Sequence, residues 1–171
     1  MTPEWIEFGR GLAYGGAACS FGLAGIGSAW GIAIASHAAA GVMREKPELF
    51  GRMLVMIALP GTQGFYGFIA AILLMVQTGL IGGGSLKISF SNGLTLRIVG
   101  FINGLAQLIT AIYQGEASAA GISLVRRRPD AAGKAVLFPA FVETYAVLSL
   151  LGTILSIIFL TQPIMLQFLS K

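Results

Sequence analysis

Four long apolar segments occupy most of this 171-residue chain, and three short connectors separate them. The segments are approximately Gly11–Met43, Met53–Leu80, Leu94–Val125 and Val136–Phe168. Each is long enough for a transmembrane helix, which needs roughly 20–25 residues. Because hydrophobic residues form 56% of the chain and charged residues only 11%, we expect an all-α membrane protein with four transmembrane helices. Little sequence remains for a soluble domain with a catalytic site.

Glycines are frequent in the first segment, which we interpret as a retained transmembrane helix rather than a signal peptide. Pairs of glycines four residues apart let membrane helices approach each other closely. Such pairs occur at Gly11/Gly15, Gly27/Gly31 and Gly100/Gly104. We therefore expect the first and third segments to pack tightly together. The second and fourth segments, richer in Leu, Ile and Phe, should face lipid.

The second half of the chain repeats the first at a distance of about 80 residues. Ser36–Gly41 corresponds to Glu116–Gly121, and Gln63 corresponds to Glu143. The repeat predicts two tandem helical hairpins with the same orientation. The predicted organisation is a first hairpin at 1–81, a non-cytoplasmic connector at 82–93 and a second hairpin at 94–171.

Basic residues are distributed unevenly between the two ends of the predicted helices. Seven lie around the two connectors that contain a proline: Arg44, Lys46, Arg52, Arg126, Arg127, Arg128 and Lys134. Four lie at the termini or around the middle connector: Arg10, Lys87, Arg97 and Lys171. Because cytoplasmic loops of membrane proteins are enriched in Lys and Arg, we expect the two proline turns in the cytoplasm and both termini outside. This topology explains the net charge of +4 without a nucleic-acid partner.

Three polar side chains are predicted at the same depth in the membrane. Gln63, Gln114 and Glu143 each lie 10–12 residues from a proline turn, which corresponds to roughly 15–18 Å along a helix. That depth is close to the middle of a hydrocarbon core about 30 Å thick. A charged carboxylate there costs about 2.5–3.5 kcal/mol, so an intramembrane Glu usually binds or transfers ions. The alternative is a protonated Glu143 that makes one interhelical hydrogen bond.

The residues around Gln63 add further oxygen atoms. Pro60 should kink the second helix and free a backbone carbonyl, most simply that of Met56. Thr62 contributes a hydroxyl group. Tyr66 follows Gln63 by three residues and so lies on the same face, from which its hydroxyl could reach a carboxylate.

The third segment carries a polar stripe on one helical face, formed by Asn103, Gln107, Thr110 and Gln114. It could be a hydrated path from the outside or a set of ordinary interhelical hydrogen bonds, and we favour the second interpretation. Glu116 should point away from Gln114. His37 has no obvious partner, so we expect it to be neutral and to have a packing or interfacial role.

The chain resembles the four-helix proteolipid of V-type ATPases, and its likeness is greatest to the sodium-translocating bacterial branch. The doubled hairpin carries this resemblance, together with the motifs Leu59-Pro60-Gly61-Thr62-Gln63-Gly64 and Phe141-Val142-Glu143-Thr144-Tyr145. It covers nearly the whole chain. It implies a multi-pass protein of a prokaryotic cell membrane that carries ions and has no catalytic site of its own.

The resemblance also implies an ion site and a set of partners. The expected Na⁺ ligands are the Leu59 carbonyl, the Thr62 hydroxyl, the Gln63 and Gln114 amide oxygens and the Glu143 carboxylate, with Tyr66 orienting Glu143. Copies of the chain would form a ring in the lipid bilayer, with the first and third helices on the inner circle. A membrane stator protein with an essential Arg would stabilise the empty carboxylate, and central-stalk proteins would bind the cytoplasmic loops. Glu116 would face the ring interior or its cytoplasmic end.

Three alternatives remain open at this point. The same rotor could carry H⁺, although that would leave the neutral oxygens of Thr62, Gln63 and Gln114 without a shared partner. A small four-helix transporter of the multidrug-exporter kind also uses a lone membrane Glu. It would need an aromatic drug pocket and would not need those three oxygens. A purely structural four-helix proteolipid would leave all of them unexplained.

Overall fold

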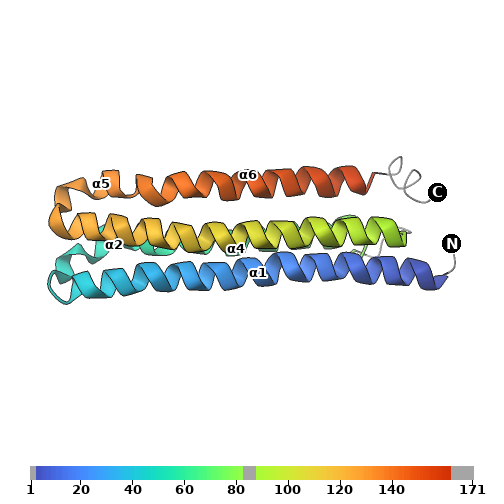
Figure 1. The fold of residues 1–171 in the computed structure, drawn as a ribbon, viewed down its shortest axis with the longest axis horizontal. Helices are drawn as coiled ribbons and strands as arrows, with labels where there is room; N and C mark the ends of the chain where they lie inside the picture. The colour runs from blue at the N-terminus through green and yellow to red at the C-terminus, as the bar shows by residue number, and fades with distance from the viewer. Residues whose placement is uncertain (1–2, 83–87, 163–171) are drawn as a thin grey trace.

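The computed structural model is a bundle of four long helical stretches that run the length of the molecule (Figure 1). It describes residues 3–82 and 88–162, so the predicted outer basic residues Lys87 and Lys171 lie outside the described residues. The first and third stretches are the unbroken helices α1 (Pro3–Met43) and α4 (Phe90–Arg127).

Prolines interrupt the second and fourth stretches. In the second, the 3-10 turn η2 separates two helices: α2 (Phe50–Ala58), η2 (Leu59–Gly61) and α3 (Thr62–Gln77). In the fourth, the chain turns at Val136 between two helices: α5 (Ala132–Ala135) and α6 (Leu137–Leu160). Two further 3-10 turns precede these stretches: η1 (Pro47–Leu49) and η3 (Pro129–Ala131).

All four stretches are long and apolar enough to cross a membrane, and residues 3–82 and 88–162 contain no strand. The predicted all-α class and the four helices are therefore confirmed. The helix bounds differ from the apolar segments. α4 begins at Phe90, inside the connector predicted at 82–93, because the Ser89 hydroxyl accepts a hydrogen bond from the Asn92 amide at 3.2 Å and so caps the helix. The division into two hairpins at residues 81 and 94 remains a prediction.

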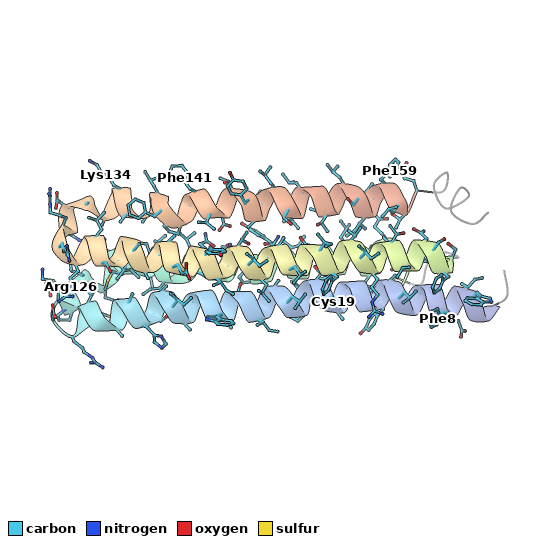
Figure 2. The ribbon with its side chains drawn as sticks, in the orientation of Figure 1. Phe8, Cys19, Arg126, Lys134, Phe141 and Phe159 are labelled. Carbon is cyan, nitrogen blue, oxygen red and sulfur yellow. The ribbon has the colours of Figure 1, made fainter. Side chains whose placement is uncertain are left out.

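The two proline turns lie together at one end of the bundle, on the left in Figure 1, and the start of α1 and the end of α6 lie at the other. Figure 2 shows Arg126 and Lys134 at this turn end. Arg126 forms an ion pair with Glu45 at 2.7 Å, Lys46 donates to the Arg126 carbonyl at 2.9 Å, and Arg52 donates to the Pro129 carbonyl at 2.6 Å. These exposed contacts hold the first turn against the second.

Glycines bring the backbones of α1 and α4 into direct contact. A Cβ atom at Gly100 would lie 2.3 Å from the Gly16 carbonyl oxygen, and one at Gly115 would lie 2.4 Å from that of Gly31. Side chains cannot fit at these positions, and the two helices run parallel. The predicted tight packing of the first and third segments is thus confirmed.

One predicted glycine pair does not take part in this contact. A Cβ atom at Gly11 would meet open space, and one at Gly15 would touch only the Arg97 guanidinium group. Gly9 and Gly16 occupy the interface instead, since Cβ atoms there would collide with the α4 backbone. The correct spacing was therefore seven residues, two turns of one helical face, and not four.

Two apolar clusters fill the ends of the bundle. The cluster nearer the proline turns comprises Ala35, Ala39, Val42, Leu49, Met53, Met56, Ile122, Val125 and Ala135. The cluster at the opposite end comprises Ala13, Ala17, Ala71, Leu74, Ile88, Leu96 and Ile157. Buried polar side chains occupy the region between them.

We predict that Gly100→Val destabilises the protein, because its side chain would force α1 and α4 apart. Overpacking of this kind costs about 1–3 kcal/mol or more. Gly152→Val on α6 is the control, since a Cβ atom there meets nothing within 4 Å. Melting temperatures in mild detergent should fall for Gly100→Val and stay near the unsubstituted value for Gly152→Val. An equal fall for both variants would contradict the assigned contact.

Candidate cation site

Pro60 shapes the first part of the site. It has no N–H group, and the chain around it forms the 3-10 turn η2, in which the Thr62 amide bonds to the Leu59 carbonyl. The Thr62 hydroxyl oxygen also lies 2.9 Å from this carbonyl oxygen. The carbonyl next to Thr62 is therefore that of Leu59, whereas simple reasoning from Pro60 pointed to Met56.

Three side-chain donors from α3 and α4 converge on the Glu143 carboxylate of α6. The Thr62 hydroxyl lies 2.9 Å from Glu143 Oε2, and Gln114 Nε2 donates to the same oxygen at 2.6 Å. The Tyr66 hydroxyl donates to the other oxygen, Oε1. Glu143 itself is half-buried. The tyrosine and glutamate that the sequence placed near each other are thus in contact.

Two fully buried glutamines complete the cluster. Gln63 Nε2 donates to Gln114 Oε1 at 2.5 Å, while the second hydrogen on Gln114 Nε2 is donated to the Pro139 carbonyl at 3.0 Å. Both amide hydrogens of Gln114 therefore have acceptors, which fixes the orientation of this side chain. Gln63 Oε1 lies 3.4 Å from the Thr62 hydroxyl.

The structure brings together all the oxygen atoms that the sequence singled out, from three of the four helical stretches. One carboxylate and several neutral oxygens form a set that suits a hard monovalent cation. In residues 3–82 and 88–162 no three His, Cys, Asp or Glu side chains gather as ligands for a transition metal. The role of these atoms as ion ligands remains a prediction.

Two contributors to the site escaped the sequence reasoning. The Pro139 carbonyl accepts from Gln114, and the Ser28 hydroxyl accepts from the Gly64 amide at 2.7 Å. A signal existed for Pro139, because this proline precedes Glu143 by one helical turn much as Pro60 precedes Gln63. Nothing in the local sequence distinguishes Ser28 from the other small residues of α1.

The remaining polar residues of the α4 stripe make interhelical hydrogen bonds, as we favoured. Asn103 donates to the Ser20 hydroxyl at 2.9 Å and accepts from the Thr153 hydroxyl at 3.2 Å. Gln107 donates to the Ala146 carbonyl at 3.1 Å. These contacts join α4 to α1 and α6.

Other polar residues of interest lie away from these contacts. Thr110 donates to the Ala106 carbonyl of its own helix at 2.8 Å. Glu116 and His37 are exposed on the surface of the bundle.

Comparison with known proteins identifies the family. The model of the family that comprises the C subunit of ATP synthase matches residues 15–74 and 98–156, one match in each half of the chain. The chain belongs to this family. It is 39% identical over 124 residues to the V-type sodium ATPase subunit K of Enterococcus hirae, covering 72% of this chain and 76% of that protein. It is 36% identical over 143 residues to the A-type ATP synthase subunit K of Methanocaldococcus jannaschii, covering 84% of this chain and 60% of that protein.

The family membership defines the class of protein. The chain is a rotor proteolipid of a V- or A-type ATPase and a multi-pass membrane protein. It is an ion-carrying component and not a catalytic one. These matches favour the rotor over the exporter and over the purely structural proteolipid.

We predict that Gln114→Leu destabilises the bundle, because it leaves the buried Gln63 amide and the Pro139 carbonyl without their partner. Each unsatisfied buried group costs about 1–3 kcal/mol. Thr110→Val is the matched control on the same helix, since Thr110 bonds only within α4. The melting temperature in detergent should fall clearly for Gln114→Leu and little for Thr110→Val. Equal stability of the two variants would contradict the network described above.

Proposed function

We propose that this rotor protein carries Na⁺ across the membrane, bound by Leu59, Thr62, Gln63, Gln114 and Glu143. The observation that carries the proposal is the convergence of Thr62, Gln114 and Tyr66 on one half-buried carboxylate, beside a second buried amide. Ion binding would neutralise Glu143, so that the loaded site could pass lipid without the cost of a bare charge.

The arrangement supports a role for each residue. The Thr62 hydroxyl has the Leu59 carbonyl as a second acceptor, so it can leave Glu143 and direct its lone pairs toward an ion. Tyr66 contacts only the far oxygen, Oε1, and can hold the carboxylate in place while Oε2 binds the ion. Gln63 and Gln114 would present their amide oxygens after a rotation of the side chains.

Sodium explains this set of residues better than a proton does. A proton site needs one carboxyl group of suitable pKa and one acceptor, whereas here two amides and a hydroxyl are also buried. Grouping so many polar atoms is costly unless they share a partner, and a hard cation provides one. The name of the E. hirae relative, a V-type sodium ATPase subunit, supports the same choice. A rotor that carries H⁺ is the second candidate.

The shape of the protomer supports a ring. α1 and α4 touch through their backbones, whereas α3 and α6 contact each other much less closely. Such a protomer is narrower on the α1/α4 side, so a ring of copies would place α1 and α4 on its inner circle and Glu143 near its outer surface. A stator protein with an Arg would release the ion there, and the proline turns would bind the central stalk. Moving one charge through 100 mV requires about 2.3 kcal/mol, which ATP hydrolysis in other subunits would supply.

We expect sodium to protect Glu143 from a carbodiimide, which reacts with the protonated carboxyl group. Gln63→Ala and Thr62→Ala should each require more sodium for the same protection, because each removes one neutral ligand. The measurement is the labelling rate of the purified ring against sodium concentration at fixed pH, with Thr110→Val as the control. If acidity alone controls the labelling rate and sodium has no effect, the site binds H⁺.

We also expect the proline turns to face the cytoplasm. In a Cys19→Ala background, Glu48→Cys and Asp130→Cys should react with a membrane-impermeant thiol reagent only from the cytoplasmic side. Both positions are exposed. Ile81→Cys, at the opposite end of the bundle, should react only from the outside. The reverse pattern in sided membrane vesicles would invert the topology.

A further inference from the structure

α1 provides none of the proposed ligands, yet one of its side chains contacts the backbone of the site. The Ser28 hydroxyl accepts a hydrogen bond from the Gly64 amide at 2.7 Å. Ser28 is only 7% exposed, and Gly64 directly follows the proposed ligands Thr62 and Gln63. The contact therefore lies between α1 and the segment of α3 that carries half of the site.

The Gly64 amide needs this acceptor because of the break at Pro60. α3 begins anew at Thr62, so the amides in its first turn have no acceptor within the helix. The residue before a helix commonly supplies one through its side chain, but here that residue is Gly61, which has no side chain. The Ser28 hydroxyl, from a different helix, takes over this capping role.

The surrounding contacts fit α1 closely around the break. A Cβ atom at Gly31 would lie 2.8 Å from Cβ of Pro60, and one at Gly64 would lie 3.2 Å from the Ser28 oxygen. Glycine at both positions lets α1 approach the turn. One turn of α1 therefore packs against Pro60 and, through Ser28, bonds to the start of α3.

We infer that Ser28 is a positioning residue of the ion site, which caps α3 from α1 and so fixes the turn Leu59–Gln63. The inference rests on the proposed ion-binding function. Loss of the cap would let the first turn of α3 shift, and with it the Leu59 carbonyl, the Thr62 hydroxyl and the Gln63 amide. Since Glu143 and Gln114 lie on other helices, a small shift of this turn separates one half of the ligand set from the other.

The test compares two buried serines of the same helix. Ser28→Ala removes the cap, Ser28→Thr keeps the hydroxyl, and Ser20→Ala removes a hydroxyl that bonds Asn103 and the Gly67 carbonyl away from the site. The readout is the sodium concentration that halves carbodiimide labelling of Glu143 in the purified ring. We expect Ser28→Ala to raise it by about tenfold, equivalent to about 1.4 kcal/mol. Ser28→Thr and Ser20→Ala should stay near the unsubstituted protein.

The outcomes separate positioning from stability. If Ser28→Ala lowers the melting temperature as Ser20→Ala does but leaves the half-protection concentration unchanged, Ser28 is merely structural and the inference is wrong. If Ser28→Ala does not assemble, Ser28→Cys keeps the volume with a weaker acceptor and should show a smaller rise in the same direction; no rise would overturn the inference.

A failure of the proposed function would be recognised separately. If sodium does not protect the unsubstituted ring, the sodium function is wrong, and Ser28 is then judged by the pH dependence of labelling. Ser28→Ala must shift that profile relative to Ser20→Ala, and an unshifted profile would overturn the inference as well.

Discussion

A single carboxylate near the middle of a membrane is the constraint on which the rest of this structure depends. Glu143 is tolerated there because a hydroxyl, an amide and a phenol all donate to it from two neighbouring helices. Those donors must reach the same point from separate helices, which requires close helix packing. The backbone contact of α1 with α4 and the proline breaks in the other two stretches meet this requirement.

The internal repeat explains how one charge came to be surrounded by neutral oxygens. Both halves contain a proline about one turn before the polar residue of the second helix, Pro60 before Gln63 and Pro139 before Glu143. The two breaks face each other across Gln114, which bonds Gln63, the Pro139 carbonyl and Glu143. Because the first half carries an amide and not a second carboxylate, four helices provide one charged group and could neutralise one monovalent ion.

Much of the fold and of the candidate site could be predicted because it depends on periodicity and depth. Apolar length indicated the four helices, and counting residues from the proline turns placed Gln63, Gln114 and Glu143 at one level. Features that depend on tertiary contacts could not be predicted. The rotation of α1 decides that Gly16 and not Gly11 meets α4, and the 3-10 geometry at Pro60 decides which carbonyl adjoins Thr62. The Ser28 cap joins residues 36 positions apart, beyond any local pattern.

The position of the two apolar clusters bears on how an ion could enter. Fully buried Met53, Met56 and Ile122 lie between the site and the proline turns, and Leu74, Leu96 and Ile157 lie on the opposite side. An ion moving along the bundle axis would have to cross one of these dry layers without oxygen ligands, at a high desolvation cost. Glu143 is instead half-exposed between α3 and α6. Exchange from the side is therefore the path of lower cost, and it requires a second protein surface to bring water to Glu143.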